Sequence, residues 1–372
     1  MKKLHVGIDG RAFSSPAAGV RRYVSGLVPA LSALDEPLDI VALGGAPDAV
    51  PSGLSYVHEP WHPATNAGWN IVGLPRAAAR AGVDVIHAPA YTAPLWSRIP
   101  TVLTIHDVSY ERHPEWYPYR RDRLRRLFYK RSARAAAHVL TDSEFSAGEI
   151  VAAYGIPRER ITVAPLGVSA RFTPGNAGAA DPLPTGVGSR FLLHVGDLHE
   201  RRNLTVVVKA LLQVRRRLDA PAVSLVLAGI DHGVGDRLRQ LAKQGKAPDA
   251  VVCLGTVSDD QLLALYRRAS ALVYPSRYEG FGLPVLEAMA CGTPVIAARA
   301  ASIPEVLGEA GILLDPDNVR GWAEAIGYVL QDDELRLGMS GQGRIRASQF
   351  TWERTARLTF EVYHVVNRTA RR

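Results

Sequence analysis

The stretch Ser276–Pro294 reads SRYEGFGLPVLEAMACGTP and places two acids, Glu279 and Glu287, on either side of a glycine-rich turn. The apolar run at 271–274 is typical of a buried parallel strand, and the residues after the turn are expected to form a helix. Such a unit brings backbone N–H groups to the carboxyl end of a strand, where α/β sheets bind ligands. Because carboxylates accept hydrogen bonds from hydroxyl groups and amides donate them, the stretch predicts a site for a polyhydroxylated ligand. Two solvated glutamates beside an ordinary turn are the simpler alternative.

The rest of the chain alternates short apolar runs with longer helical segments. Strands that alternate with helices form parallel sheets covered on both faces, so the pattern predicts an α/β protein. The predicted strands are 4–8, 83–87, 102–106, 138–141 and 161–165 in the first half, and 191–195, 224–228, 251–254, 271–274, 295–297 and 312–314 in the second.

Length and one compositional break predict the domain organisation. A chain of 372 residues is too long for a single comfortable core. Residues 173–189, TPGNAGAADPLPTGVGS, are rich in Gly, Pro and Ala and nearly free of large apolar side chains, which is typical of a linker. We therefore expect an N-terminal domain over 1–172, a C-terminal domain over 190–352, and a final amphipathic helix over 353–372.

Composition and charge limit the cellular context. Lysine and arginine number 44 against 36 acidic residues, a net charge of +8, which favours anionic partners such as nucleotide phosphates, nucleic acid or a membrane surface. Cys253 and Cys291 have no metal-ligand spacing and are expected to be buried thiols in a reducing compartment. The N-terminus lacks the apolar run of a signal peptide, and no stretch approaches the ~18 apolar residues of a membrane span. We expect a cytoplasmic protein that is soluble or attached to a membrane surface.

Residues 279–297, EGFGLPVLEAMACGTPVIA, resemble the E-x7-E motif and its flanks in the retaining family-4 glycosyltransferases, which have the GT-B fold. The resemblance implies an α/β chain of two Rossmann-like, doubly wound parallel-sheet domains that face a central cleft. It also implies that the C-terminal helix returns to the first domain, that Glu279 contacts the donor sugar and that Glu287 accepts hydrogen bonds from the ribose. The backbone N–H groups implied to donate to sugar or phosphate are those near Phe281, Gly282 and Leu283.

A second motif, HVGDLHERRNL at 194–204, resembles the family's strand that ends in glycine before a basic pair and an asparagine. Two cations at a helix start suit a pyrophosphate, above all the charge that develops on a leaving nucleoside diphosphate. The family usually has Arg-Lys where this chain has Arg201 and Arg202, so which arginine carries this role stays open. A solvated basic helix start is the alternative. Gly196 and Asn203 are implied to bind the donor.

Candidate residues of the first half follow predicted strands. Gly19 opens a helix, where a glycine lets the backbone approach a phosphate or an acceptor hydroxyl; the resemblance makes it a donor-binding candidate. The loop lacks a G-x-G-x-x-G fingerprint, so NAD binding is not supported. His106, in the run TIHDV at 104–108, read alone is more often structural than catalytic. The family often carries His-Asp here, with the histidine reaching the donor sugar, so His106 is favoured over His87 and Asp142.

The segment Tyr119–His138, YRRDRLRRLFYKRSARAAAH, predicts a basic helix with Leu124, Leu127 and Phe128 as its apolar side. A solvated charged face is one interpretation. Arginine and lysine around an apolar stripe also suit an anionic membrane surface, in keeping with the lipid-linked acceptors that the family uses. Nucleic-acid binding is disfavoured, because no aromatic platform or binding motif accompanies the charge.

The activity that these features imply is retaining transfer of a hexose from a nucleotide sugar to a glycan or lipid-linked acceptor in surface polysaccharide biosynthesis. The blocks HDVSY at 106–110 and HPEWY at 113–117 look most like mannosyltransferases, which favours GDP-mannose over UDP-glucose, UDP-GlcNAc and dTDP-rhamnose as the donor. No Asp-x-Asp cluster ends a strand, so neither a metal ion nor a cofactor is expected. The expected catalytic residues are His106, Arg201, Arg202 and Glu279. Alanine at Glu279 or Arg201 should lower turnover and leave the fold intact.

Two other functions on the same fold stay open, a non-catalytic nucleotide-sugar-binding protein and a nucleotide-sugar epimerase. The intact set of arginines and glutamates argues against loss of activity. A sugar phosphorylase would need a lysine that carries pyridoxal phosphate, and the sequence has no convincing candidate. Formation of a new epimer without any acceptor would identify an epimerase.

Overall fold

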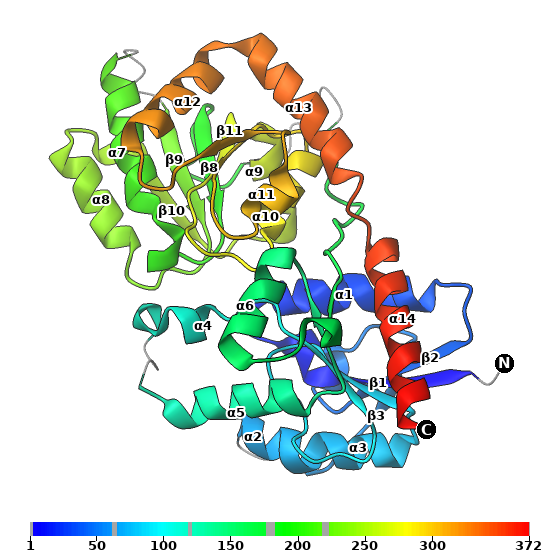
Figure 1. Cartoon of the computed structure of the whole chain (residues 1–372). Helices are drawn as coiled ribbons and strands as arrows, with labels where there is room; N and C mark the ends of the chain where they lie inside the picture. Colours follow the sequence, from blue (N-terminus) through cyan, green and yellow to red (C-terminus); the bar gives the residue numbers. More distant parts are fainter. Residues whose placement is uncertain (1–2, 62–64, 118–120, 176–182, 218–222, 372) are drawn as a thin grey trace. The chain divides into compact units, whose positions relative to one another are not determined.

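A computed structural model describes residues 3–61, 65–117, 121–175, 183–217 and 223–371 (Figure 1). The chain forms two compact units, one of residues 1–167 with 351–372 and the other of residues 168–350. The first unit ends before the boundary expected at 172, because Arg171 forms ion pairs with Asp259 and Asp260 of the second unit. Residues 176–182 of the predicted linker lie outside the described residues.

The first unit contains a parallel seven-stranded sheet with the order β3-β2-β1-β4-β5-β6-β7. Its strands are β1 Leu4–Asp9, β2 Leu38–Leu43, β3 Ser55–Val57, β4 Val85–Ala88, β5 Thr101–Thr104, β6 His138–Thr141 and β7 Ile161–Val163. All five predicted strands of this half are confirmed. The run predicted at 102–106 begins and ends earlier, so His106 lies two residues beyond the end of β5.

Helices cover both faces of this sheet. They are η1 Gly10–Ser14, α1 Ala18–Ser32, η2 Pro47–Ala49, α2 Asn66–Gly68, η3 Trp69–Gly73, α3 Leu74–Ala81, α4 Ser109–Arg112, η4 Pro114–Trp116, α5 Arg123–Ala135, α6 Glu144–Tyr154, η5 Arg158–Arg160 and the C-terminal α14 Trp352–Ala370. Local signals set their ends: the Ser143 side chain accepts a hydrogen bond from the Ser146 amide at the start of α6, and Gly155 ends it in the left-handed conformation.

The C-terminal helix α14 belongs to the first unit and packs against α1 (Figure 1). Gly26 of α1 makes this close approach possible, because a Cβ atom there would lie 2.1 Å from the indole ring of Trp352. A larger residue at this position would push α14 away from the sheet that it covers.

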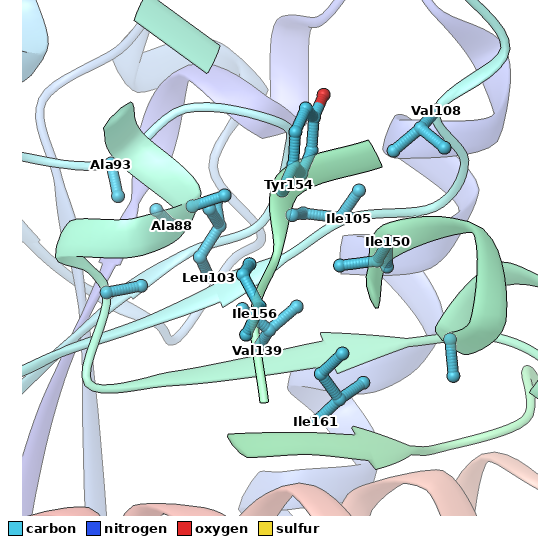
Figure 2. Packing of buried hydrophobic residues seen from close by; sticks show 13 residues of the cluster. Ala88, Ala93, Leu103, Ile105, Val108, Val139, Ile150, Tyr154, Ile156 and Ile161 are labelled. Carbon is cyan, nitrogen blue, oxygen red and sulfur yellow. The ribbon is translucent and has the colours of Figure 1, made fainter. Parts of the chain in front are cut away.

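The hydrophobic core of the first unit includes a cluster beneath α6 (Figure 2). Ile150 and Tyr154 of α6 pack there against Leu103, Val139 and Ile161 of three neighbouring strands. Because the strands of a parallel sheet are buried on both faces, their sequences are predominantly apolar, which is what made them recognisable.

The second unit contains a parallel six-stranded sheet with the order β10-β9-β8-β11-β12-β13. Its strands, β8 Phe191–Val195, β9 Ser224–Ala228, β10 Val251–Gly255, β11 Ala271–Tyr274, β12 Val295–Ala298 and β13 Ile312–Leu314, confirm all six predictions. Its helices are η6 Glu200–Arg202, α7 Leu204–Arg217, α8 Gly235–Gln244, η7 Pro248–Ala250, α9 Asp259–Arg268, α10 Leu283–Ala290, α11 Ile303–Leu307, α12 Val319–Gln331 and α13 Asp333–Ala347. The predicted α/β class with two doubly wound sheets is therefore confirmed.

The strand order reverses once in each sheet, between β1 and β4 in the first unit and between β8 and β11 in the second. Open α/β sheets bind ligands outside the carboxyl ends of the strands at such reversals. The loops after these four strands are therefore expected to bind ligands. Within the described ranges, no helix is both long enough and apolar enough to cross a bilayer.

Candidate active site

In the second unit, the loop after β8 meets the loop after β11. The Arg277 amide donates a hydrogen bond of 2.9 Å to the carbonyl oxygen of Arg201. These two loops hold the basic pair and the first acid of the sequence motifs, which lie 77 residues apart in the chain. The strand-order reversal thus brings the two motifs together.

Arg202 lies at the centre of this site and is only 8% exposed. Its Nη1 donates to the hydroxyl groups of Tyr274 and Ser276 and pairs with the carboxylate of Glu279. Burial lowers the pKa of Arg202 from its usual value, yet a guanidinium stays charged in proteins. The carboxylate of Glu279, itself 6% exposed, supplies the opposite charge. The result is a buried ion pair at the carboxyl end of β11.

One side of the Arg202 guanidinium has no protein acceptor. Its Nε is buried and, within the described part of the chain, has no hydrogen-bond partner. A buried donor without a partner costs free energy, and a ligand that accepts its hydrogen bond would remove that cost. Phosphate oxygens are strong acceptors for a guanidinium, so this edge of Arg202 suits a phosphate group.

Arg201 lies on the other side of the same carboxylate. Its Nη1 donates to the carbonyl oxygen of Tyr278 at 3.1 Å and stands 3.7 Å from Oε2 of Glu279. Both arginines therefore face Glu279, but Arg202 is the more deeply buried of the two. Since charges interact more strongly away from water, Arg202 is the one better placed to stabilise a developing negative charge.

Gly196, at the end of β8, leaves room for the Arg202 side chain. Its φ of +127° is a backbone conformation that favours glycine, and a Cβ atom there would lie 3.2 Å from Nη2 of Arg202. Gly229 follows β9 and packs still more tightly, because its Cβ would lie 2.2 Å from the carbonyl oxygen of Gly196. Glycine at these two strand ends therefore allows the close packing of Arg202 and of the two loops.

Gly196→Ala is expected to lower the free energy of unfolding by about 1–3 kcal/mol, the usual cost of a strained backbone conformation. Gly341→Ala is the matched control: Gly341 lies inside α13, and a Cβ there meets no atom within 4 Å. Alanine should stabilise that helix by up to about 1 kcal/mol. Urea unfolding of both variants measures whether the free energy of unfolding falls for Gly196→Ala and rises for Gly341→Ala. An unchanged midpoint for Gly196→Ala would contradict the expectation.

The turn of the motif leads into α10 as predicted. Gly282 has a φ of +107° and precedes Leu283, the first residue of α10. The N–H groups of a first helical turn have no carbonyl partner within the helix, so they can donate to a ligand. The Phe281 side chain is buried against Phe350, so only its backbone can serve a ligand, and the Ser302 hydroxyl, 3.0 Å from the Phe281 carbonyl oxygen, braces the turn.

Glu287 lies inside α10, is buried, and accepts a hydrogen bond of 2.8 Å from the Tyr266 hydroxyl of α9. This bond fixes the orientation of the carboxylate. Asn203 adopts a left-handed conformation with a φ of +52°, and its side-chain amide donates to the carbonyl oxygen of Pro316 at 2.6 Å. Asn203 thus helps to shape the loop, and the donor contact that the sequence motif implies stays a prediction.

A cavity of about 640 Å³ adjoins this loop and is lined by Asn203, Arg277 and parts of α7 and α8. Neither Arg202, Glu279 nor Glu287 belongs to its lining. The cavity is therefore a neighbour of the arginine–glutamate cluster and does not contain it.

In the first unit, His106 is held by two acceptors. Its Nδ1 lies 2.8 Å from Oδ2 of Asp142, and its Nε2 lies 3.2 Å from the carbonyl oxygen of Pro89. A carboxylate and a carbonyl oxygen can only accept, so when Asp142 is ionised both ring nitrogens carry protons and the side chain is an imidazolium. Asp142, which the sequence favoured less than His106 as a site residue, is thus the direct hydrogen-bond partner of His106.

The pKa values agree with this geometry. Burial lowers the pKa of His106, but the attraction of Asp142 outweighs burial and raises it above its usual value. Burial raises the pKa of Asp142, and His106 opposes that shift. Since the folded pKa of His106 is raised, the pair contributes its full stability below the usual histidine value of about 6.5. That contribution is lost as pH rises through the folded pKa.

Gly19 lies at the exposed start of α1, and a Cβ there would meet no atom within 4 Å. Its neighbours therefore do not require glycine. The polar cluster at the end of β1 involves other residues: Asp9 accepts hydrogen bonds from the Arg11 guanidinium and from the Trp69 indole. Sequence inspection did not single out this cluster, because Trp69 lies 60 residues from Asp9.

Two family models match the chain, one over each half. The model described as Glycosyltransferase Family 4 matches residues 17–172, and the model described as Glycosyl transferases group 1 matches residues 181–346. The second match covers both loops of the arginine–glutamate cluster. The predicted family resemblance is therefore confirmed.

Curated relatives carry different activities. The O-antigen chain mannosyltransferase B of Escherichia coli is 35% identical over 270 residues, which cover 71% of this chain and 70% of that protein. The D-inositol 3-phosphate glycosyltransferase of Pseudarthrobacter chlorophenolicus is 32% identical over 76% of this chain and 70% of its own length. The glycogen synthase of Mycobacterium tuberculosis is 31% identical over 77% of this chain and 70% of its own length.

Solved structures show the same fold at low sequence identity. Sucrose-phosphate synthase from Thermosynechococcus elongatus aligns with a TM-score of 0.75 and 22% identity over 97% of this chain and 98% of that chain. Anabaena HepE in complex with UDP and glucose aligns with a TM-score of 0.72 and 18% identity over 98% of this chain and 100% of that chain. The two sheets, the matched family models and these relatives agree, so this chain belongs to the family-4, or group 1, glycosyltransferases and has the GT-B fold.

Proposed function

We propose that the protein is a retaining hexosyltransferase that moves mannose from GDP-mannose to a glycan or lipid-linked acceptor in surface polysaccharide biosynthesis. The observation that carries the proposal is the buried cluster of Arg202 and Glu279, flanked by Arg201, at the strand-order reversal of the second unit. The mannosyltransferase relative supports the choice of sugar. Because other relatives are named as an inositol phosphate glycosyltransferase and a glycogen synthase, the experiment below also includes other nucleotide sugars.

The proposed chemistry uses the two arginines as electrostatic catalysts. The bond between the anomeric carbon and the diphosphate oxygen breaks, and its electron pair leaves with the diphosphate. Arg202 and Arg201 stabilise that charge. The acceptor oxygen bonds to the anomeric carbon on the same face, and its proton passes to the leaving phosphate oxygen.

Glu279 is proposed to accept hydrogen bonds from the donor sugar and to act neither as nucleophile nor as base. Its carboxylate is already paired with Arg202 and stands close to Arg201, so these cations lower its basicity and its nucleophilicity but leave acceptor sites for hydroxyl groups. Same-face attack needs no enzyme nucleophile. Glu287, held by Tyr266, is proposed to bind the ribose. His106 of the first unit is proposed to contact the transferred sugar. The acceptor is proposed to bind to the first unit.

The positive charge is proposed to come from the arginines, so transfer should not require a divalent cation. The decisive experiment measures nucleoside diphosphate release from GDP-mannose, UDP-glucose, UDP-GlcNAc and dTDP-rhamnose, each with EDTA and with or without membrane lipid extract. Release from GDP-mannose that survives EDTA and increases with the extract is the expected result. Release from another donor alone would correct the sugar, and loss of release in EDTA would overturn metal-independent catalysis. No release and no nucleotide binding would overturn the transferase proposal.

We further propose that α5 attaches the protein to the inner face of the cytoplasmic membrane. The helix begins after Asp122, which caps it, and residues 119–120 of the predicted segment lie outside the described residues. Of the predicted apolar side, Leu124 is 79% exposed and Leu127 44% exposed, whereas Phe128 is half-buried. Arginines at 123, 125 and 131 and a lysine at 130 lie on the same helix. Exposed leucines among cations suit an anionic lipid surface.

The double variant Leu124→Asp, Leu127→Asp is expected to lose at least half of its binding to vesicles of equimolar phosphatidylglycerol and phosphatidylcholine, because both substitutions remove apolar contact and add repulsion. Cosedimentation measures the bound fraction. Leu337→Asp is the matched control, since Leu337 is a leucine 73% exposed on α13. Equal binding of wild type and double variant would exclude α5 as the contact.

A further inference from the structure

Four buried polar side chains connect the C-terminal helix to the strand ends of the first unit. The Tyr363 hydroxyl of α14 lies 2.6 Å from Nδ1 of His87, and Nε2 of His87 lies 2.8 Å from Oγ1 of Thr104. Oγ1 of Thr104 also lies 2.9 Å from the hydroxyl of Tyr23 in α1. All four side chains are almost completely buried. They form an unbroken hydrogen-bonded chain from α14 through β4 and β5 to α1.

His87 is a neutral ring in this chain. Burial, together with the smaller effect of the His106 charge, lowers the pKa of His87 to about 3. A neutral imidazole donates with one nitrogen and accepts with the other. If Nε2 donates a hydrogen bond to Thr104, Nδ1 accepts a hydrogen bond from the Tyr363 hydroxyl, and both ring nitrogens have hydrogen-bond partners. Thr104 then receives a hydrogen bond from a ring whose position α14 determines.

The far end of the chain touches His106. The Tyr23 ring stands edge-to-face with the His106 ring, with centroids 4.9 Å apart and planes 81° apart. The other groups around His106 are Asp142, Asp107, the Pro89 carbonyl and the Tyr91 ring, whose centroid is 6.0 Å away. Tyr23 is therefore one wall of the pocket that directs both N–H groups of His106 to their acceptors.

We propose that His87 is a positioning residue: with Tyr363 and Thr104 it fixes Tyr23 against His106, so the C-terminal helix sets the orientation of the His106 imidazolium. A small rotation of the His106 ring lengthens its bond to Asp142 or to Pro89, because those acceptors lie on opposite sides of the ring. The expected loss of kcat rests on the proposed function of His106. The expected change in the titration of His106 does not rest on that function.

The test compares Tyr363→Phe and His87→Leu with the control Tyr154→Phe. Tyr363→Phe removes only the hydroxyl at one end of the chain. Tyr154 is an equally buried tyrosine of the same unit, but its hydroxyl pairs with Tyr110 and not with this chain. The protonation of His106 is followed by nitrogen NMR as a function of pH, with its signals assigned by their loss in His106→Asn. The rate of diphosphate release from GDP-mannose is measured on the same proteins.

In Tyr363→Phe and His87→Leu, His106 is expected to lose its second proton at a lower pH than in the wild type, because its ring is less firmly held on Asp142. The value of kcat should fall about 10- to 100-fold, as for a misplaced catalytic group, with little change in KM for the donor. Tyr154→Phe should change neither quantity. An unchanged titration of His106 in Tyr363→Phe, whatever the loss of thermal stability, would overturn the inference. If no donor supports transfer, the titration still decides the positioning role, while the transferase proposal fails separately.

Discussion

Arg202→Ala is expected to lower kcat for diphosphate release about 1,000-fold, as seen when a preorganised donor to a developing negative charge is removed. The group proposed to contact the leaving phosphate is the buried Nε, which has no hydrogen-bond partner among the described residues. Arg202→Lys should lose less activity, since it retains a positive charge, but the three N–H groups of an ammonium cannot serve Tyr274, Ser276, Glu279 and the phosphate at once.

Arg237→Ala is the control for this prediction. Arg237 forms an ion pair with Glu200 in which both side chains are about half exposed, and such surface pairs contribute little. The kcat of Arg237→Ala should stay within about twofold of the wild-type value. Steady-state kinetics with GDP-mannose measure all three variants, and wild-type turnover in Arg202→Ala would eliminate Arg202 from the catalytic site.

Glu279→Ala is expected to lower the free energy of unfolding by about 3–5 kcal/mol, because it leaves the buried guanidinium of Arg202 without its counter-charge. This differs from the expectation drawn from the sequence, in which alanine at Glu279 leaves the fold intact. The structure supplies the reason: the nearest partner of the carboxylate is a buried cation. Urea unfolding followed by circular dichroism measures the change.

Glu279→Gln separates stability from activity. Glutamine keeps the volume and an acceptor for Arg202, so it should unfold closer to the wild type than alanine does. It lacks the charge that strengthens hydrogen bonds to sugar hydroxyls, so kcat should still fall about 100-fold. A glutamine variant as active as the wild type would show that the carboxylate charge is not used in transfer.

Much of the fold could be predicted from local sequence. Parallel strands are buried on both faces, and their apolar runs in the second unit, such as 191–195 and 224–228, are continuous and matched the observed strands closely. The glycine turn at Gly282 and the start of α10 were also predictable, because a turn with positive φ before a helix favours glycine. These signals depend on neighbouring residues alone.

Element ends were harder to predict. The apolar pattern at 102–106 extends past the end of β5 at Thr104, so the sequence placed His106 on the strand when it lies beyond it. Leu124 and Leu127 formed a recognisable apolar stripe, but their exposure could not be read from spacing, because the same spacing occurs on helices that pack against a core.

By itself the sequence determined that this protein has two parallel α/β sheets and that Arg201, Arg202 and Glu279 are site candidates, because apolar runs and a long, specific motif are local properties. Only the tertiary structure decided which groups meet. Asp142 lies 36 residues from His106 and Tyr363 lies 276 residues from His87, yet both pairs form hydrogen bonds. Likewise, burial of Arg202 against Glu279 depends on two loops that come together where the strand order reverses. Charge, protonation and hydrogen bonding in a site are set by neighbours in space, and no spacing along the chain records them.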